Sequence, residues 1–178
     1  MPFYEDLENI VSNATAQIMS NQNICKLLYY YPKNTDLRYD PYAQPDVEKP
    51  NELLLAHIFP IPKTPDAQTN QICFVDVTVS GGDKYRDGNT GFRRILLHFD
   101  IVCHLDAWFI KGGFRPIRIM SEIDKMFNNQ QVLNVVNLPQ PLPFYAKDYS
   151  NKFYGYQLTY ELLVNSNIPC GVETTNGN

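Results

Sequence analysis

One alternating stretch, RILLHFDIVCH from Arg94 to His104, sets the strongest constraint on the fold. Its apolar side chains fall at every second position, which are Ile95, Leu97, Phe99, Ile101 and Cys103. Successive side chains of a β-strand point to opposite faces, so this spacing predicts a long strand with one buried face and one wetter face. A helix would scatter the same side chains around its circumference. We therefore expect this strand at the centre of a sheet, with Ile95, Leu97, Phe99 and Ile101 in the core.

Two further stretches have strand character. Residues 72–79 carry alternating apolar side chains, and so do residues 153–164, FYGYQLTYELLV. We place three side chains of the second stretch in the core, namely Tyr156, Leu158 and Tyr160. The four glycines of residues 81–91, GGDKYRDGNTG, predict a mobile hairpin loop between residues 72–79 and the central strand. Residues 132–138 are a candidate for another short strand.

Apolar residues spaced three and four apart predict helices over about residues 4–20, around Ile24 to Leu28, and from Pro116 to Phe127. The third helix would lie across the sheet on Ile117, Met120, Ile123, Met126 and Phe127. With 178 residues, the chain is long enough for one domain and short for two. We expect a single domain over residues 1–178, of α+β class, with one antiparallel or mixed sheet and helices packed on one face.

The segment from Pro32 to Pro65 differs from its neighbours because it contains seven prolines. Proline lacks an amide donor and breaks helices and inner strands, which predicts an extended arm. A short apolar run at residues 53–59 can form a strand within it. We interpret the arm as an interface element anchored by Tyr39 and Tyr42, since aromatic side chains dominate interface hot spots. The alternative is that the arm folds back over its own sheet.

Composition narrows the classes of function. The formal net charge is −4, from 15 basic and 19 acidic residues, and no basic run could grip a phosphate backbone. The sequence contains no run of about 18 apolar residues, so we expect no membrane span, and its acidic start predicts no signal peptide. None of the four cysteines has CxxC spacing, and we interpret Cys73 and Cys103 as buried thiols of a protein made in a reducing cytosol.

The polar residues show no catalytic pattern. His98, Asp100 and His104 share the wetter face of the central strand, but the two histidines lie about 20 Å apart along a strand and cannot share one metal ion. A polar face toward solvent or a partner is the favoured interpretation. There is no GxSxG nucleophile elbow, and no lysine–serine or lysine–threonine pair follows the glycines of residues 81–91 at a phosphate-binding spacing. We therefore expect no enzymatic activity, no cofactor and no metal.

Four stretches carry a resemblance to a known family, and they are ICFVDVTVSGG, GFRRILLHFDIVCHLDAW, RPIRIMSEIDKMF and FYGYQLTYELLV. In this order they resemble the tail-terminator proteins of tailed bacteriophages, which are also called tail-completion or neck proteins. The opening NQNICKLLYY, followed by IFPIPKTPDAQTNQICFVDV, is also similar to phage neck proteins. The resemblance covers most of the chain as a pattern of elements.

The resemblance implies a virion protein of the neck, made in the host cytoplasm, that forms a ring with copies of itself, expected to be a hexamer. Such a ring covers the tail tube protein, stops tube growth and joins the tail to head-completion or adaptor proteins, while DNA passes through the lumen as cargo. Lys84, Tyr85 and Arg86 are then candidate contacts to a neighbouring subunit. Two alternatives stay open: a head–tail adaptor or stopper of the same neck, and a small α+β ligand-binding domain or hydrolase unrelated to phages.

Overall fold

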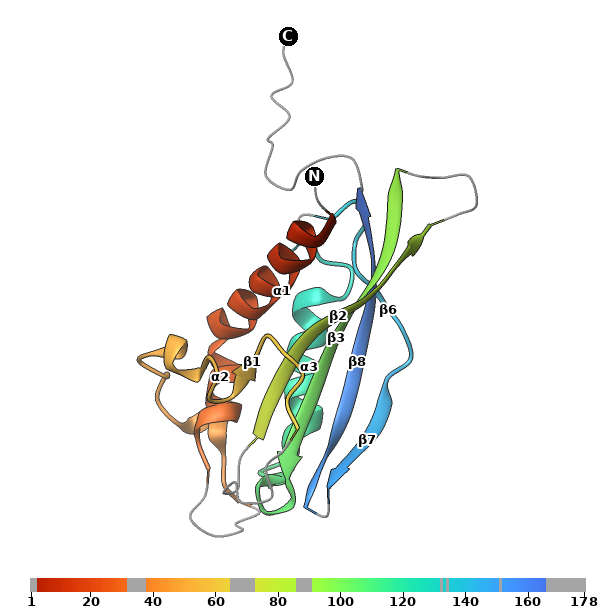
Figure 1. Ribbon diagram of the computed structural model, residues 1–178. Coiled ribbons are helices and arrows are strands. Elements are labelled where there is room, and N and C mark those ends of the chain that lie inside the picture. The colour runs from red at the N-terminus through yellow and green to blue at the C-terminus, as the bar shows by residue number, and fades with distance from the viewer. Residues whose placement is uncertain are drawn as a thin grey trace.

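The computed structural model describes residues 3–31, 38–64, 73–85, 91–131, 133, 135–150 and 152–165. Within these ranges, three α-helices pack on one face of a mixed six-stranded sheet (Figure 1). This arrangement confirms the predicted α+β class. The sheet is mixed because its first strand runs parallel to its neighbour, whereas the other pairings are antiparallel. None of the described helices is both long and apolar enough to cross a membrane.

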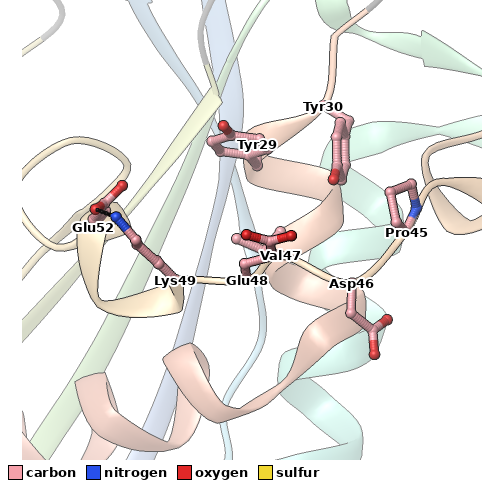
Figure 2. A pocket seen from close by; sticks show the side chains of 8 residues that line it. All are labelled: Tyr29, Tyr30, Pro45, Asp46, Val47, Glu48, Lys49 and Glu52. Carbon is pink, nitrogen blue, oxygen red and sulfur yellow. Dashed lines mark hydrogen bonds and ion pairs between the residues drawn. The ribbon is translucent and has the colours of Figure 1, made fainter.

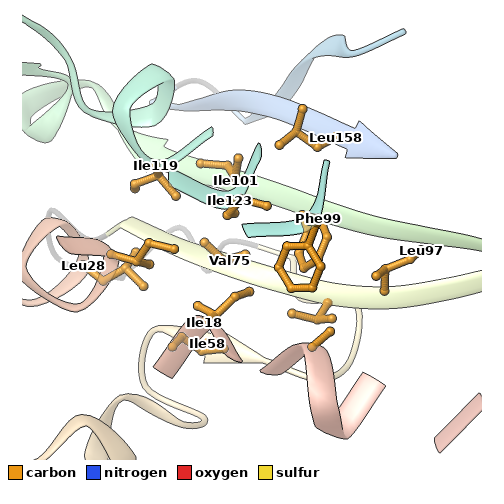
Figure 3. Close-up of a cluster of buried hydrophobic side chains, with 14 of the residues drawn as sticks. Ile18, Leu28, Ile58, Val75, Leu97, Phe99, Ile101, Ile119, Ile123 and Leu158 are labelled. Atoms are coloured by element: carbon orange, nitrogen blue, oxygen red, sulfur yellow. The ribbon is translucent and has the colours of Figure 1, made fainter. Parts of the chain in front are cut away.

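Strand β3, from Phe92 to His104, is central in the sheet. It pairs with β2 (Cys73–Lys84) on one side and with β8 (Phe153–Asn165) on the other. The predicted alternation appears as burial, since every second side chain of β3 from Ile95 onward turns toward the helices (Figure 3). The buried side chains of β3 and β8 include Ile95, Leu97, Phe99, Ile101, Leu158 and Tyr160.

Tyr156 departs from the expected core, because it is only partly buried. It lies opposite Ile101 in the register of β3 and β8. Its ring packs against the rings of Trp108 and Phe144, with centroids 6.2 Å and 6.0 Å away. Phe144 is itself exposed, so this end of β8 has an aromatic cover that solvent still reaches. The alternation of the sequence predicted which face of the sheet carries Tyr156, but not how completely other side chains cover it.

Helices α1 (Phe3–Ser20) and α2 (Gln22–Tyr29) follow each other with a single residue between them. That residue, Asn21, caps α2, and its side-chain oxygen accepts hydrogen bonds from the backbone amides of Asn23 (2.9 Å) and Ile24 (3.3 Å). The capping asparagine satisfies amides that have no partner within the helix. The chain therefore turns sharply, and both helices reach the same core.

Helix α3 (Arg115–Phe127) crosses β3 and β8 as expected, but its buried face is rotated from the predicted one. Ile123, which points into the core in Figure 3, is fully buried, whereas Ile117 is only partly buried. The ring of Phe127 packs 4.8 Å from the ring of Phe99 and 6.1 Å from the ring of Tyr160. The helix therefore turns the face that carries Ile123 and Phe127 toward the sheet.

The hairpin between β2 and β3 corrects the predicted loop at residues 81–91. Strand β2 continues to Lys84, which lies opposite Arg93, so the loop is shorter than expected. Gly81 and Gly82 have φ values of +90° and +113° and form a bulge within the ladder instead of ending it. A Cβ atom at Gly81 would lie 3.2 Å from the carbonyl oxygen of Arg94. Residues 86–90 lie outside the described residues.

The described part of the proline-rich segment, residues 38–64, belongs to the subunit's own fold. It forms two short 3₁₀ turns, Pro41–Ala43 and Pro50–Leu53, and a two-residue strand β1, Ile58–Phe59, that pairs in parallel with β2. Its buried side chains are Pro41, Val47, Leu53, Ile58 and Phe59. These residues fit the alternative in which the segment folds back over its own sheet, because their apolar side chains are buried in the subunit. A further contact of the segment with a partner stays a prediction. Residues 32–37 and Pro65 lie outside the described residues.

Four further strands of the described chain lie outside the central three. A small hairpin of β4 (Phe109–Ile110) and β5 (Gly113–Phe114) precedes α3. Two strands that the sequence did not indicate, β6 (Gln140–Pro141) and β7 (Tyr145–Ser150), pair with β8. The short strand predicted at residues 132–138 is not present in the described residues there, although the amide of Val136 donates a hydrogen bond to Leu163.

Candidate functional site

A hollow of about 310 Å³ lies between the end of α2 and the segment that follows the first 3₁₀ turn (Figure 2). We call it the acidic notch. Figure 2 shows Tyr29, the last residue of α2, and Tyr30 after it on one side and residues 45–52 on the other. The lining residues are Tyr29, Tyr30, Pro45, Asp46, Val47, Glu48, Lys49 and Glu52.

The segment is held in place at Val47, whose side chain is buried. The amide of Val47 donates to Gln22 Oε1 at 2.9 Å, and its carbonyl accepts from Gln22 Nε2 at 3.2 Å. The side chain of Gln22 thus forms hydrogen bonds with both the backbone amide and the backbone carbonyl of Val47. Because Val47 points inward, its charged neighbours Asp46 and Glu48 are turned outward and are exposed.

The notch carries more negative than positive charge. Its lining holds three carboxylates and one lysine, Lys49, which pairs with Glu52 at 2.9 Å. Asp46 pairs with Lys26 of α2 at 2.8 Å. Glu48 is exposed, and within the described residues it forms no ion pair. The notch therefore offers a carboxylate to a cation that comes from outside the subunit.

The notch also offers aromatic surface. The rings of Tyr29 and Tyr30 meet edge to face with centroids 5.0 Å apart, and Tyr29 is 53% exposed. Aromatic faces and carboxylates together suit a lysine or arginine side chain, because the ring attracts the cation while the carboxylate pairs with it. This site was not among the residues predicted from the sequence. The alternation of Asp46, Val47 and Glu48 after Pro45 was the available signal, since it predicts charges on one side and an apolar anchor on the other.

The two groups of predicted interface residues lie apart from each other. Tyr42 packs against the core, and burial raises the pKa of its hydroxyl, with the nearby Glu122 carboxylate adding to the shift. Tyr39 is partly buried, and its carbonyl accepts a hydrogen bond from the amide of Lys111 at 2.8 Å. Both tyrosines are thus bound into their own subunit. Their role as interface anchors stays a prediction.

Lys84 and Tyr85, in contrast, are exposed on the β2–β3 hairpin. The hairpin extends beyond the helices at the far end of the sheet from α2 (Figure 1). Arg93 steadies its base by donating a hydrogen bond from Nη1 to the carbonyl of Gly82 at 3.2 Å. Arg86 lies outside the described residues. Interface contacts by these residues stay a prediction.

A second hollow, of about 360 Å³, lies at the end of the sheet near Trp108. We call it the aromatic groove. A row of rings borders it, because Tyr156 contacts both Trp108 and the exposed Phe144. Its lining residues are Leu105, Trp108, Ala146, Lys147, Tyr154, Gly155 and Tyr156. The groove is mainly apolar and carries one basic side chain.

The polar face of β3 forms hydrogen bonds within the sheet. His98 Nε2 lies 2.7 Å from Ser80 Oγ, and its Nδ1 lies 3.0 Å from Thr159 Oγ1. Burial lowers the pKa of His98. His104 is buried separately and accepts a hydrogen bond from the amide of Asp106. Within the described residues, no group of three histidine, cysteine or carboxylate side chains could hold a metal ion.

Two carboxylates lie directly opposite each other on this face, Asp76 of β2 and Asp100 of β3. Asp100 is well bonded, because it accepts from Tyr149 at 2.7 Å and from Gln157 at 3.1 Å. Asp76 is 3% exposed, and its Oδ2 accepts from the amide of Lys63 at 2.8 Å, whereas Oδ1 has no hydrogen-bond partner among the described residues. Burial raises the pKa of Asp76 to about 7, and the charge of Asp100 adds to the rise.

We expect Asp76→Asn to stabilise the protein at neutral pH. The raised pKa means that the folded state holds a proton that the unfolded state releases above its ordinary pKa of 3.8. Stability is therefore full below about pH 4 and falls as the pH rises to about 7. The asparagine variant does not lose this stability. Its free energy of unfolding should therefore exceed that of the wild type by up to about 4 kcal/mol at pH 8 and equal it near pH 4.

Urea unfolding of both proteins across this pH range measures the difference. Asp83→Asn is the matched control, because Asp83 is an exposed acid on the same strand and should change little at any pH. A constant difference between Asp76→Asn and wild type at all pH values would contradict the raised pKa.

The chain was also compared with known proteins. A family model named YomW matches residues 21–162, which run from the cap of α2 into strand β8. The chain belongs to the YomW family. The family name resembles those of genes in a Bacillus prophage region, which points to a phage-derived protein. No curated protein matches the chain.

Proposed function

We propose that the protein is a structural component of a phage neck, a ring-forming tail terminator that covers the end of the tail tube and joins it to the head-completion proteins. Membership of the YomW family supports a phage origin. The resemblance of the strand and helix sequences to tail-terminator proteins supports the particular role. The proposed protein is a virion component without enzymatic activity.

The observation that carries the proposal is the open edge of β2. Within the described residues, β1 pairs with β2 only at Val75 and Asp76, so β2 from Val77 to Lys84 has a strand neighbour on one side alone. An open edge presents unpaired amides and carbonyls that readily pair with another chain, and monomeric proteins usually protect such edges. The projecting hairpin at the end of this edge adds exposed surface for a neighbour. Both features suit a subunit that assembles.

In the proposed mechanism, identical subunits close into a hexameric ring, which cyclic symmetry favours. One side of the ring covers the last ring of the tail tube and thereby prevents further subunits from adding. The other side receives head-completion proteins. The formal charge of −4 per subunit weakens contact between the ring and DNA, so that DNA can pass through the lumen.

Two other functions have support from particular observations. A head–tail adaptor or stopper would use the same assembling edge but would dock on the head. A small-molecule binding domain is favoured by the aromatic groove, whose volume of about 360 Å³ and apolar lining fit an apolar ligand. The terminator is the better supported of the three, because the groove does not account for the open edge and the projecting hairpin.

We expect the purified full chain to form rings that stop tube growth. Electron microscopy and sedimentation measure the ring, and isolated tail tubes incubated with excess tube protein measure termination. Tubes treated with the protein should keep their length, whereas untreated tubes should lengthen. Rings that bind heads and leave tube growth unchanged would support the adaptor instead. A protein that stays monomeric at all concentrations and does not bind tubes would contradict both neck functions.

A further inference from the structure

We propose that the acidic notch of one subunit receives Lys84 and Tyr85 from the β2–β3 hairpin of the neighbouring copy. The inference rests on the proposed ring and names the contact that closes it. The occupant is a second copy of this chain, and the contact joins two different surfaces of the subunit.

Charge complementarity is the first support. The notch lining holds three carboxylates against one lysine, and that lysine is already paired with Glu52. The hairpin carries the opposite charge, because Lys84, Arg93 and Arg94 are basic and only Asp83 is acidic among its described charged residues. Complementary charge of this kind steers subunits together and fixes which surfaces meet.

The availability of the two partners is the second support. Lys84 is exposed and forms no ion pair within the described residues. Glu48 of the notch is also exposed and also forms no ion pair there. Arg94, in contrast, already lies 3.9 Å from Glu161 of its own subunit. Lys84 is therefore the hairpin cation that can pair with Glu48. Its neighbour Tyr85 can then lie against Tyr29, which is exposed at the rim of the notch.

The placement of the two surfaces is the third support. The hairpin and the α2 end of the subunit lie on opposite sides of the molecule (Figure 1), so the hairpin cannot reach the notch of its own subunit. A contact between unlike surfaces of identical chains is heterologous, and it closes into a ring when the rotation between subunits allows it. The bulge at Gly81 and Gly82 interrupts the regular register of β2 and β3 near the end of the ladder that carries Lys84.

Charge reversal of each partner tests the contact. The variants are Glu48→Lys, Lys84→Glu and the double variant with both changes, all in the full chain. Each single variant should raise the protein concentration at which half of the subunits are in rings by about tenfold or more, and the double variant should return it toward the wild-type value. Sedimentation across a concentration series measures the midpoint.

Two controls separate this effect from a general change in charge or stability. Glu8→Lys on α1 and Lys152→Glu before β8 reverse exposed charges that belong neither to the lining of the notch nor to the hairpin, and they should leave the midpoint unchanged. Thermal unfolding of all variants should match the wild type, since the changed side chains are exposed.

The outcomes distinguish the contact from the ring itself. If the wild type forms rings and the single reversals leave the midpoint unchanged, the notch does not hold the hairpin, while the proposed function stands. If both single variants lose assembly and the double variant does not recover it, the pairing of Lys84 with Glu48 is likewise overturned. If the wild type forms no rings and does not bind tail tubes, the proposed function fails and the contact fails with it.

Discussion

Gly155→Ala is expected to destabilise the subunit by more than about 3 kcal/mol, because a Cβ atom has no room at this position. The new atom would lie 1.7 Å from the carbonyl oxygen of Ile101 and 3.1 Å from Cα of Val102. Both neighbours are backbone atoms of β3, which is paired on both sides, so neither can move without breaking the central ladder. The strand β8 would have to separate from β3 at its most crowded point.

Gly113→Ala is the matched control. Its Cβ would meet only the side chain of Arg118, at 3.4 Å, and an exposed arginine can move aside. Urea unfolding and the soluble yield of both variants measure the effect. The expected result is a protein close to wild type for Gly113→Ala and a largely insoluble or early-melting protein for Gly155→Ala. Equal stability of the two would show that β8 does not approach β3 as closely as the structure has it.

Arg115→Met is expected to cost about 2 to 4 kcal/mol of unfolding free energy. The guanidinium is fully buried and joins three segments of chain. It donates from Nε to Ala107 at 2.7 Å, and from Nη1 to the carbonyls of Leu27 at 2.5 Å and Tyr30 at 3.0 Å. Methionine fills a similar volume but leaves three carbonyls without this donor. The cation also lies 4.9 Å from the ring centre of Tyr31.

The position of Arg115 explains why a buried cation is stable without a carboxylate beside it in these contacts. The carbonyls of Leu27 and Tyr30 belong to the C-terminal end of α2, where the helix dipole is negative and carbonyls lack partners within the helix. The arginine satisfies them and ties α2 to the start of α3. Within the part of the chain that the structure describes, its Nη2 atom has no hydrogen-bond partner.

Arg118→Met separates this role from the general loss of an arginine on α3. Arg118 is exposed and donates one hydrogen bond, from Nη2 to Gly112 at 2.9 Å. Its replacement should change the unfolding free energy by less than about 0.5 kcal/mol. Denaturant unfolding of both variants measures the difference. A similar small effect at Arg115 would mean that water or chain movement replaces its bonds at little cost.

The sequence by itself determined the parts of the fold that depend on local spacing. The alternation around Phe99 set the register of the central strand, because shifting a strand by one residue moves every side chain to the other face. The helix predicted around Ile24 to Leu28 is likewise present as α2, with Asn21 as its N-terminal cap. The α+β class followed from these elements.

The tertiary structure alone decided how the proline-rich segment is used. Proline excluded helices and inner strands there, and the observed β1 is indeed a two-residue edge strand. Whether Val47 and Ile58 faced solvent, a partner or the subunit's own core depended on contacts with residues far away in the sequence. The bonds between Val47 and Gln22 are an example, because they join positions 25 residues apart.

The surfaces proposed for function could also not be predicted from the local sequence pattern. Asp76 lies on the wetter face of its strand by alternation, yet it is buried, with Phe59 beside it in β1 and the amide of Lys63 bonded to its carboxylate. The acidic notch needs the end of α2 and the segment after Pro45 together, and neither forms a hollow alone. Periodicity reports which way a side chain points, whereas burial and charge at a site depend on what long-range packing places opposite it.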